Sequence, residues 1–389
     1  MRNNLPLVCL AAVALAATVA TQTAAAQEGQ RSWGNGNVQR FATLPARTAS
    51  SGAPLGHPEG LCADSWGDIF ANTFELPGSG GYVQNYIYAF GPNGTLKTST
   101  PVPTGVVPLG CIISGSQLFV NDVINGNELM YDLPLTNTSL PAMTFHICAG
   151  FVGNPGPFCA LNANYPGPDG RIYMSDNGDA AYGDNIGRIW ALDPKTGNSS
   201  IFIDPPQLLV PTLPVNKYVP SGQVLPFSAN GIAFSRDGSA LYIAQMSTNT
   251  IYKQAVQNCG DPLTGCQPLG SITQFSKDPN GQIQGPDNMD FDFDGNLWVA
   301  SGQNHHLIQL NSRGNIIGVY GSFHGFDPQG APIGLFQPSG VIFSQGKIYV
   351  GNESNQGLIP ANVQIGWSYL KLFTISVIDP SSSGWGHND

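Results

Sequence analysis

The acids with the most regular spacing lie in residues 285–298, GPDNMDFDFDGNLW. Asp290, Asp292 and Asp294 alternate before a glycine, as in the calcium loop of a helical hand. That loop requires a bidentate acid at its twelfth position, where this sequence has Ser301. The three acids are therefore predicted to serve the scaffold, with their side chains on one side of a strand that turns at Asp294 and Gly295.

The Asp287-Asn288 pair that precedes these acids belongs to a set of residues at the heads of short apolar strands. Aligned on the glycine turns that follow, the equivalent positions hold Glu59 (HPEGLC), Leu109 (PLGCII), Asn162 (ALNANY), Asn230 (SANGIA) and Ser339 (QPSGVI). Polar residues at the start of apolar strands need a reason, because burying them unpaired costs free energy.

Four of the six heads aim a carboxylate or carboxamide at one axis. A site with two carboxylates and amide oxygens, without Cys or His, favours Ca²⁺ over zinc or copper. Glu59, Asn162, Asn230, Asp287 and Asn288 are the predicted ligands. The alternative is that these side chains cap strand ends and hydrogen-bond one another around a water-filled channel.

The elements that must position these heads are repeated along the chain. Six segments share a glycine turn followed by a short strand with an aromatic third residue, about 50 residues apart. They are DIFANT from Asp68, QLFVND from Gln117, RIYMSD from Arg171, ALYIAQ from Ala240, NLWVAS from Asn296 and KIYVGN from Lys347.

Such a period, with four strands in each unit, predicts an all-β, six-bladed β-propeller whose four-stranded blades surround a central channel. We expect one domain over residues 27–389, in which a strand near Val38–Leu44 completes the blade that ends at Phe373–Pro380. Two long loops, Asp204–Phe227 and Asn355–Tyr369, should open on the face of the strand heads. The apolar, Pro-rich first loop is predicted to pack as a lid over the channel mouth.

The compartment follows from the first 26 residues. Arg2, the apolar run Leu5–Ala20 and the small residues Ala24–Ala26 predict a cleaved secretory signal peptide and a secreted or periplasmic protein. No later stretch has the apolar length of a membrane span. The formal net charge of −10 becomes about −11 without Arg2, which argues against a nucleic-acid partner. The oligomeric state stays open.

The cysteines fit this compartment. Of seven, Cys9 lies in the signal segment, and the remaining even number in an oxidising environment favours disulfides. Cys259 with Cys266, and Cys148 with Cys159, each enclose a short loop rich in Gly and Pro. Cys62 and Cys111 would remain as the third pair, although spacing alone does not assign the pairing.

The sequence resembles the six-bladed calcium-dependent lactonases, the regucalcin and gluconolactonase family with the related paraoxonases. The resemblance covers nearly the whole mature chain and is specific at the strand heads. It implies Glu59, Asn162, Asn230 and Asp287 as calcium ligands. The Asp287-Asn288 pair is similar to paraoxonase, whereas regucalcin-like members usually have Asp-Gly there.

Two departures from the family stand out. Paraoxonases have a histidine where this chain has Leu109, so that base does not carry over. The family's second, structural calcium uses carboxylates where this chain has Gly60 and Ala163, so the resemblance implies a single Ca²⁺ at the channel mouth.

The implied chemistry is hydrolysis of a lactone or related ester. Calcium polarises the carbonyl and stabilises the oxyanion that forms when water attacks. The resemblance implies Asp287 as general base. His305 and His306 are candidate proton shuttles, as is His57, and each has a surface role as its alternative. The predicted lid is apolar, and no Arg or Lys lies near the motifs. These features favour a neutral, lipophilic small-molecule substrate.

Rival functions remain. One is a non-catalytic propeller that binds a ligand or partner, with calcium serving structure. Another is a lyase or a strictosidine-synthase-like enzyme on the same fold, although strictosidine synthases generally lack the full calcium set. The sequence has no GxSxG elbow, no HExxH, and no GxGxxG between a strand and a helix, so serine-hydrolase, zinc-protease and dinucleotide functions have no support.

Overall fold

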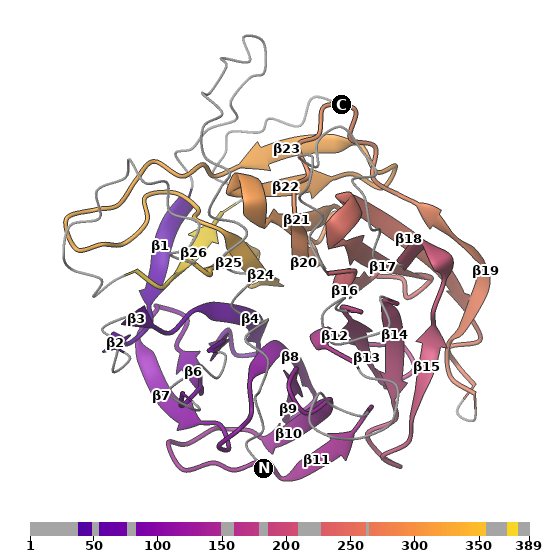
Figure 1. Ribbon diagram of the computed structural model, residues 1–389, viewed down its shortest axis with the longest axis horizontal. Coiled ribbons are helices and arrows are strands. Elements are labelled where there is room, and N and C mark those ends of the chain that lie inside the picture. Colours follow the sequence, from indigo (N-terminus) through magenta and orange to yellow (C-terminus); the bar gives the residue numbers. More distant parts are fainter. Residues whose placement is uncertain are drawn as a thin grey trace, which may run out of the picture.

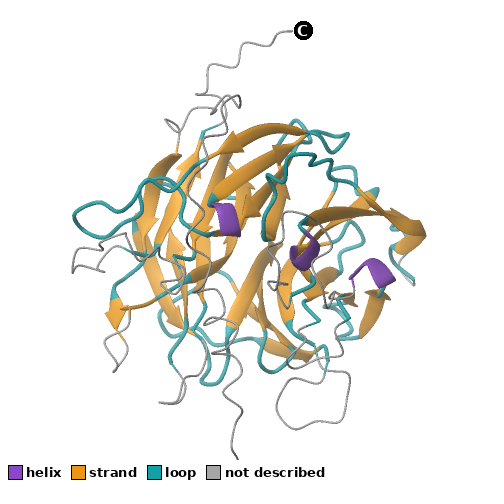
Figure 2. Cartoon of the chain, turned by 45° about the horizontal axis from the view of Figure 1, so that its top comes forward, coloured by secondary structure: helices purple, strands orange, loops and turns teal. Residues whose placement is uncertain are grey.

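The computed structural model describes residues 38–48, 54–75, 83–148, 159–178, 186–208, 227–261, 264–354 and 372–379. These residues form six four-stranded antiparallel sheets around a central axis (Figure 1). The helices among them are short 3-10 turns (Figure 2): η3 (Pro206–Leu208), η4 (Met246–Thr248) and η5 (Gly302–Asn304). The all-β, six-bladed propeller predicted from the repeats is confirmed.

Each blade contains four strands in chain order from the axis outward. Blade one holds β4 (Pro58–Ala63), β5 (Ile69–Thr73), β6 (Tyr86–Phe90) and β7 (Leu96–Pro101). Blade two holds β8 (Pro108–Ser114), β9 (Gln117–Asp122), β10 (Asn127–Asp132) and β11 (Met143–His146). Blade three holds β12 (Leu161–Pro166), β13 (Ile172–Asp176), β14 (Arg188–Leu192) and β15 (Ser199–Ile203).

The second half of the ring repeats this pattern. Blade four holds β16 (Ala229–Phe234), β17 (Ala240–Gln245), β18 (Thr250–Gln257) and β19 (Gln267–Gln274). Blade five holds β20 (Pro286–Phe291), β21 (Leu297–Ser301), β22 (His306–Leu310) and β23 (Ile316–Tyr320). Blade six holds β24 (Pro338–Ser344), β25 (Lys347–Asn352), β26 (Thr374–Ile378) and β1 (Val38–Thr43), and a small pair joins β2 (Arg47–Thr48) to β3 (Pro54–Leu55).

The two ends of the described chain close the ring. β1 pairs antiparallel with β26, from Val38 opposite Ile378 to Thr43 opposite Thr374. The expected completion of the last blade by the N-terminal strand is therefore confirmed. Main-chain hydrogen bonds within blade six thus join the two ends of the described chain and close the ring.

The core lies between neighbouring blades. The aromatic third residues of the repeated strands are all buried: Phe70, Phe119, Tyr173, Tyr242, Trp298 and Tyr349. They bridge blades directly, as where the Tyr242 ring lies 5.1 Å from that of Phe291 in blade five. Burying each large apolar side chain contributes about 1.5–3 kcal/mol, which explains why the repeat retains an aromatic at this position.

The six cysteines of the described chain lie in pairs at disulfide distance: Cys62 with Cys111, Cys148 with Cys159, and Cys259 with Cys266. The pairing suggested by the spacing is thus confirmed. Cys62 and Cys111 join the inner strands of blades one and two. Pairs of this kind favour an oxidising compartment.

Several sequence predictions fall outside the described residues. These are the signal peptide at 1–26, nearly all of the 204–227 insertion and the loop at 355–369. Within the described ranges, no helix has the length and apolar character needed to cross a bilayer.

Candidate functional site

The heads of the six inner strands are structurally equivalent because each one is the first residue of a β-bulge. In β20, for example, Pro286 pairs with Ser301 but the next paired residue is Met289, which leaves Asp287 and Asn288 unpaired. The same interruption occurs in the other five inner strands, at 59–60, 109–110, 162–163, 230–231 and 339–340. A bulge re-aims a side chain out of the strand alternation, and here it does so six times around one axis.

The local sequence supports these bulges. A proline precedes the head in four blades, at Pro58, Pro108, Pro286 and Pro338. Proline is tolerated at the first residue of a strand because it has no N–H to donate. The recurrent proline is a sequence signal that locates the heads independently of their polarity.

The second bulge residue is small where neighbouring blades approach each other closely. A Cβ at Gly60 would lie 2.1 Å from the carbonyl oxygen of Leu109, and one at Gly231 would lie 2.2 Å from that of Asp287. Since neither position has room for a side chain, the carboxylate that the family's second calcium would need at position 60 cannot be accommodated on this backbone.

The predicted ligands carry oxygen atoms without partners. Glu59, Asn162, Asn230 and Asp287 are each no more than 6% exposed. Among the described residues, Asn162 Oδ1, Asn230 Oδ1 and Asp287 Oδ1 are buried and accept no hydrogen bond. An unsatisfied buried oxygen costs about 1–3 kcal/mol. Three such atoms at equivalent bulges fit a cation that takes oxygen ligands.

The two carboxylates of this set are electrostatically strained. Burial, followed by the charges of Asp287 and Glu353, raises the pKa of Glu59 well above its usual range. Burial and the charge of Glu353 raise the pKa of Asp287 to about 8. Acids this close and this buried favour a bound cation, which would offset both burial and repulsion.

The heads of blades two and six behave differently. Leu109 packs in an apolar cluster with Val107, Val123 and Ala160. Ser339 is fully buried, and its Oγ donates to the carbonyl oxygen of Pro58 at 2.9 Å. Both side chains are therefore satisfied by the protein itself.

A third acid near the site was missed by the sequence alignment. Glu353 follows β25 and is half-buried, and its charge contributes to the raised pKa of both Glu59 and Asp287. Burial raises the pKa of Glu353 itself. Glu353 directly follows Asn352, which pairs with Pro338, the residue before the head of blade six. Its place near the heads therefore depends on the strand register of blade six, which the sequence pattern alone does not show.

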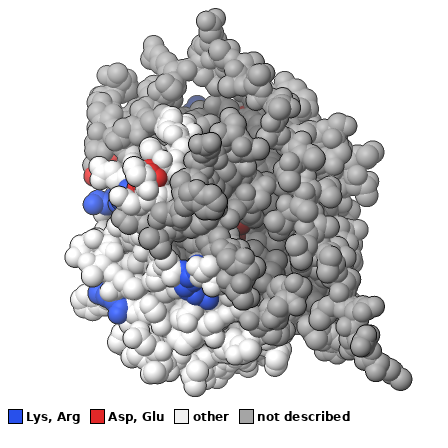
Figure 3. Space-filling model, turned by 60° about the vertical axis from the view of Figure 1, so that its left-hand side comes forward, with Lys and Arg blue, Asp and Glu red and all other residues white. Residues whose placement is uncertain are grey.

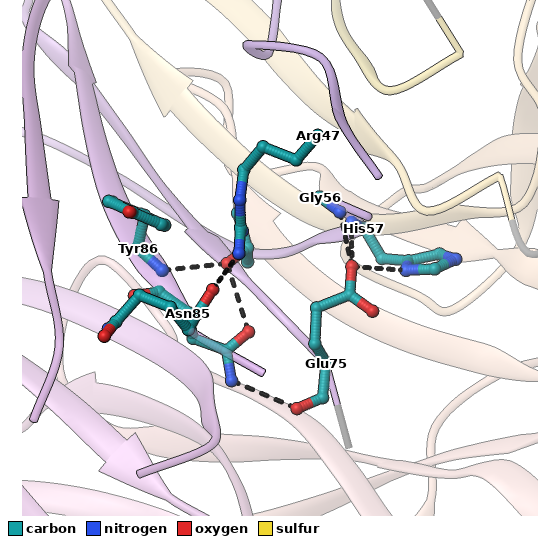
Figure 4. Close-up of polar contacts among 8 residues, drawn as sticks. Arg47, Gly56, His57, Glu75, Asn85 and Tyr86 are labelled. Carbon is teal, nitrogen blue, oxygen red and sulfur yellow. Dashed lines mark hydrogen bonds and ion pairs between the residues drawn. The ribbon is translucent and has the colours of Figure 1, made fainter. Parts of the chain in front are cut away.

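His57 is held in a fixed orientation by Glu75, a residue that the sequence did not single out. Its Nδ1 lies 2.9 Å from Glu75 Oε1, which also accepts from the main-chain nitrogens of Gly56 and His57 (Figure 4). The ring packs 4.5 Å from that of Phe373. Burial opposes the charged imidazolium, but the hydrogen bond and charge of Glu75, with Glu353, raise the pKa of His57. Contact with a carboxylate leaves Nε2 as the nitrogen that can meet a ligand.

The other two predicted histidines are occupied differently. The main-chain nitrogen of Gln337 donates to His305 Nδ1 at 3.2 Å, so Nδ1 carries no proton. Burial and the neighbouring His306 lower the pKa of His305 to about 4, and burial lowers that of His306. His306 Nε2 lies 3.3 Å from Ser322 Oγ. Within the described residues, no hydrogen bond joins either histidine to a predicted ligand.

His305 has a structural counterpart in blade four. Both His305 and Asn249 end a 3-10 turn in the left-handed conformation, with φ of 62° and 56°. Asn249 Oδ1 accepts from the main-chain nitrogen of Gly285, two residues before Asp287, as His305 accepts two residues before Ser339. This equivalence gives His305 a role in holding the head of the next blade.

Asn288 lies deeper than the four heads. It occupies the second bulge position and lines an axial cavity of about 20 Å³ together with Asn164 and Asp290. That volume is sufficient for about one water molecule. The structure thus separates Asn288 from the ring of heads by one residue along the channel.

The alternating acids are scaffold, as predicted. Asp290 accepts hydrogen bonds from the Tyr165 hydroxyl and the main-chain nitrogen of Phe343. Asp292 accepts from the indole of Trp298 at 2.8 Å. These acids tie strands together at the end of the channel away from the heads.

The composition of the candidate site explains why acid clusters alone do not reveal it. Among the described residues, no three His, Cys, Asp or Glu side chains are grouped as metal ligands. The set at the heads consists of two carboxylates and two amides. On the face drawn in Figure 3, charged side chains of the described residues are few and scattered, without the broad basic patch of a nucleic-acid surface.

The site and fold together define a six-bladed propeller with buried carboxylate and amide groups at the heads of its inner strands, and comparisons with known proteins narrow this class. A family model, the SMP-30/Gluconolactonase/LRE-like region, matches residues 159–322. This range covers blades three to five and includes Asn162, Asn230 and Asp287, whereas Glu59 lies outside it.

Individual proteins agree with this match. Lactonase drp35 of Staphylococcus epidermidis is 32% identical over 90 residues, 23% of this chain and 26% of that protein. Its counterpart in Staphylococcus aureus is 31% identical over 90 residues. The aligned stretch thus spans about a quarter of the length of these relatives.

Solved structures share the fold. Regucalcin from Agrobacterium tumefaciens, described as a calcium-binding protein, has a TM-score of 0.55 and 16% identity, covering 87% of this chain and 96% of that chain. A gluconolactonase from Xanthomonas campestris has a TM-score of 0.51 and 14% identity, covering 89% and 98%. The resemblance to the regucalcin and gluconolactonase group is therefore confirmed by fold and by the family match.

Proposed function

We propose that this protein is a calcium-dependent hydrolase of lactones or related esters, exported from the cell. The observation that carries the proposal is the set of three buried oxygens without partners, on Asn162, Asn230 and Asp287, at equivalent bulges beside Glu59. The match to a lactonase over 90 residues and to the gluconolactonase family model supports the reaction class.

The residues at the heads have distinct roles in this proposal. Glu59, Asn162, Asn230, Asp287 and Asn288 would hold one Ca²⁺, with Asn288 at the second position of the blade-five bulge. A calcium ion there would polarise the substrate carbonyl and stabilise the negative charge that develops on its oxygen.

The chain's own groups supply the remainder of the chemistry. Asp287 is proposed to accept a proton from the attacking water, as the resemblance implies. His57, fixed by Glu75, offers Nε2 as a hydrogen-bonding group near Glu59. His305 and His306 remain candidate proton shuttles through His305 Nε2 and His306 Nδ1, because Nδ1 of His305 and Nε2 of His306 already have partners.

The test is hydrolysis by the purified mature protein across a panel of lactones and aryl esters. Samples treated with EDTA and samples restored with calcium are compared. We expect activity that is lost on chelation and recovered with calcium. Activity that is indifferent to chelation, or no turnover across the panel, would refute the proposal.

Calcium binding is measured separately by calorimetry, so that the site can be tested without turnover. Asp287→Asn is compared with Leu109→Ala, a change at the equivalent head of blade two, rather than with a change at Ser339, because Ser339 hydrogen-bonds the side chain of Glu59. We expect binding to one ion per chain, severely weakened only by Asp287→Asn. Binding without hydrolysis of any substrate would favour the non-catalytic alternative.

A further inference from the structure

A second ring of six residues, here called the outer ring, neighbours the heads. Each of its members directly follows the second strand of a blade. In every blade, the residue that follows the second strand donates its main-chain N–H to the carbonyl oxygen two residues before the head, over 2.8–3.1 Å. The six donors are Phe74, Val123, Asn177, Met246, Gly302 and Glu353. Because this bond recurs in all six blades, these residues occupy equivalent places around the channel mouth.

The side chains of this outer ring lie against the heads. Phe74 and Val123 pack in the cluster that contains Leu109. In blade four, Asn230 Nδ2 lies 3.7 Å from the sulfur of Met246. A substrate whose carbonyl reaches the heads must therefore pass between these outer-ring side chains.

The ring is divided in character. Blades one and two present the apolar side chains of Phe74 and Val123 beside Leu109, the apolar head of blade two, and Phe74 is half-buried and thus accessible. Blade six presents the carboxylate of Glu353, and blade five presents no side chain at Gly302. A ligand meets an apolar wall at blades one and two and a negative charge at blade six, which is the neighbour of blade one.

We propose that this outer ring selects the substrate: a neutral lactone or ester whose apolar substituent lies against Phe74, Leu109 and Val123. The inference rests on the proposed function and specifies its substrate class. Apolar contact favours a substituent that leaves water. The Glu353 carboxylate disfavours substrates that carry their own negative charge, because like charges in a partly buried site repel.

The test uses a series of γ-lactones with methyl, butyl, hexyl and octyl substituents. We expect kcat/KM of the native protein to rise by about two- to fourfold per methylene over the first few carbons. Phe74→Ala should flatten this rise, so that kcat/KM falls more for the octyl lactone than for the methyl lactone. Phe74→Leu should give an intermediate slope and serves if the alanine variant does not fold.

The matched control is Phe293→Ala, the same change at a 69% exposed phenylalanine in the turn between β20 and β21. That turn is at the opposite end of the inner strand from Asp287, so the chain-length dependence should remain. A flattened slope in this control, or an unchanged slope in Phe74→Ala, would overturn the proposed wall.

The charge half of the proposal has its own measurement. A lactone with a terminal carboxylate on its chain is compared with the neutral lactone of equal length. Glu353→Gln should raise the ratio of kcat/KM for the charged over the neutral substrate by about tenfold. An unchanged ratio would overturn the assignment of Glu353.

Binding separates this inference from failure of the proposed function. If none of the lactones is hydrolysed, the hydrolase proposal fails, and calorimetry with the corresponding γ-lactams then tests the ring alone. A Kd that tightens with chain length in the native protein but not in Phe74→Ala would support the ring. Hydrolysis or lactam binding without any chain-length dependence would overturn it.

Discussion

The head of blade five and the heads of blades two and six share one backbone geometry but differ in what surrounds their side chains. Asp287 is buried with an oxygen that accepts no hydrogen bond from the described residues. Leu109 and Ser339 occupy the same bulged position, one in an apolar cluster and the other donating to Pro58. The bulge is therefore a property of the fold.

The difference shows which heads have a function beyond folding. A satisfied side chain at a bulge contributes to stability, whereas an unsatisfied one costs free energy that folding alone does not recover. Such a cost at three equivalent positions is explained by a ligand. Substituting a head whose oxygen has no partner should therefore weaken calcium binding, whereas substituting a satisfied head should mainly lower stability.

The largest effect is expected for Asp287→Asn. The amide keeps an oxygen but removes a negative charge, so calcium affinity should fall by about 100-fold or more, about 2.7 kcal/mol. Lactone hydrolysis should be lost with it. Calorimetry measures the affinity, and a loss of less than about threefold would contradict the assignment of Asp287 as a ligand.

Calcium removal should destabilise the folded protein by a comparable amount. At a calcium concentration 100 times the Kd, binding stabilises the native state by about 2.7 kcal/mol. Thermal or urea unfolding with EDTA and with calcium measures this difference. The Asp287→Asn variant should unfold at nearly the same point under both conditions, whereas Leu109→Ala should keep the native difference between EDTA and calcium.

Leu109→Ala should lower stability without weakening calcium binding, and it should also reduce the chain-length dependence, because Leu109 belongs to the proposed apolar wall. Truncating a buried leucine costs about 2–5 kcal/mol, and the small cluster around Leu109 places this change near 2 kcal/mol. Calcium affinity should remain within about twofold of the native value. A large loss of affinity without loss of stability would contradict the distinction between the two kinds of head.

Ser339→Ala should have a smaller effect. It removes one buried hydrogen bond, to the carbonyl of Pro58, and should cost about 1 kcal/mol. Urea unfolding measures this cost, with calcium held constant. A cost near that of Leu109→Ala would indicate that Ser339 does more than tie blade six to blade one.

At neutral pH the smallest effect concerns the His305 and Asn249 pair, because this effect develops only in acid. The pKa of His305 is lowered from 6.5 to about 4 in the folded state, so between these values the unfolded chain binds the extra proton. Stability should therefore fall as pH decreases from about 6.5 to 4, by at most about 1.4 kcal/mol per pH unit.

His305→Asn should remove this contribution, because asparagine accepts the same bond at Asn249 and tolerates the left-handed backbone. Urea unfolding at several pH values compares the variant with the native protein. The reciprocal Asn249→His should introduce a similar slope in blade four. Identical pH profiles for all three proteins would contradict the equivalence of the two positions.

Much of the fold was predictable because each repeat is marked by residues that are close together in the sequence. The glycine turns and buried aromatics, such as Tyr173 and Trp298, mark each second strand with a period that only a ring of similar blades explains. The same alignment located Glu59 and Asp287 as heads. Closure by residues 38–43 followed from the one strand lacking in the last blade.

The residues that the sequence analysis missed lie in connections whose position depends on how the blades pack, and the repeat pattern does not describe this packing. Glu75 and Glu353 come from connections after second strands, and their relation to His57 and Asp287 depends on how blades one, five and six meet. Similarly, nothing in the sequence near His305 indicates that its Nδ1 accepts a bond from Gln337, 32 residues away.

By itself, the sequence determined the number of blades, the identity of the strand heads and the oxygen character of their side chains, because these depend on period and residue type. The tertiary structure alone decided which heads are satisfied. Whether an oxygen finds a donor depends on the neighbouring blade, and blades meet only when the ring closes. That closure leaves Asp287 Oδ1 without a donor among the described residues and gives the Ser339 hydroxyl an acceptor.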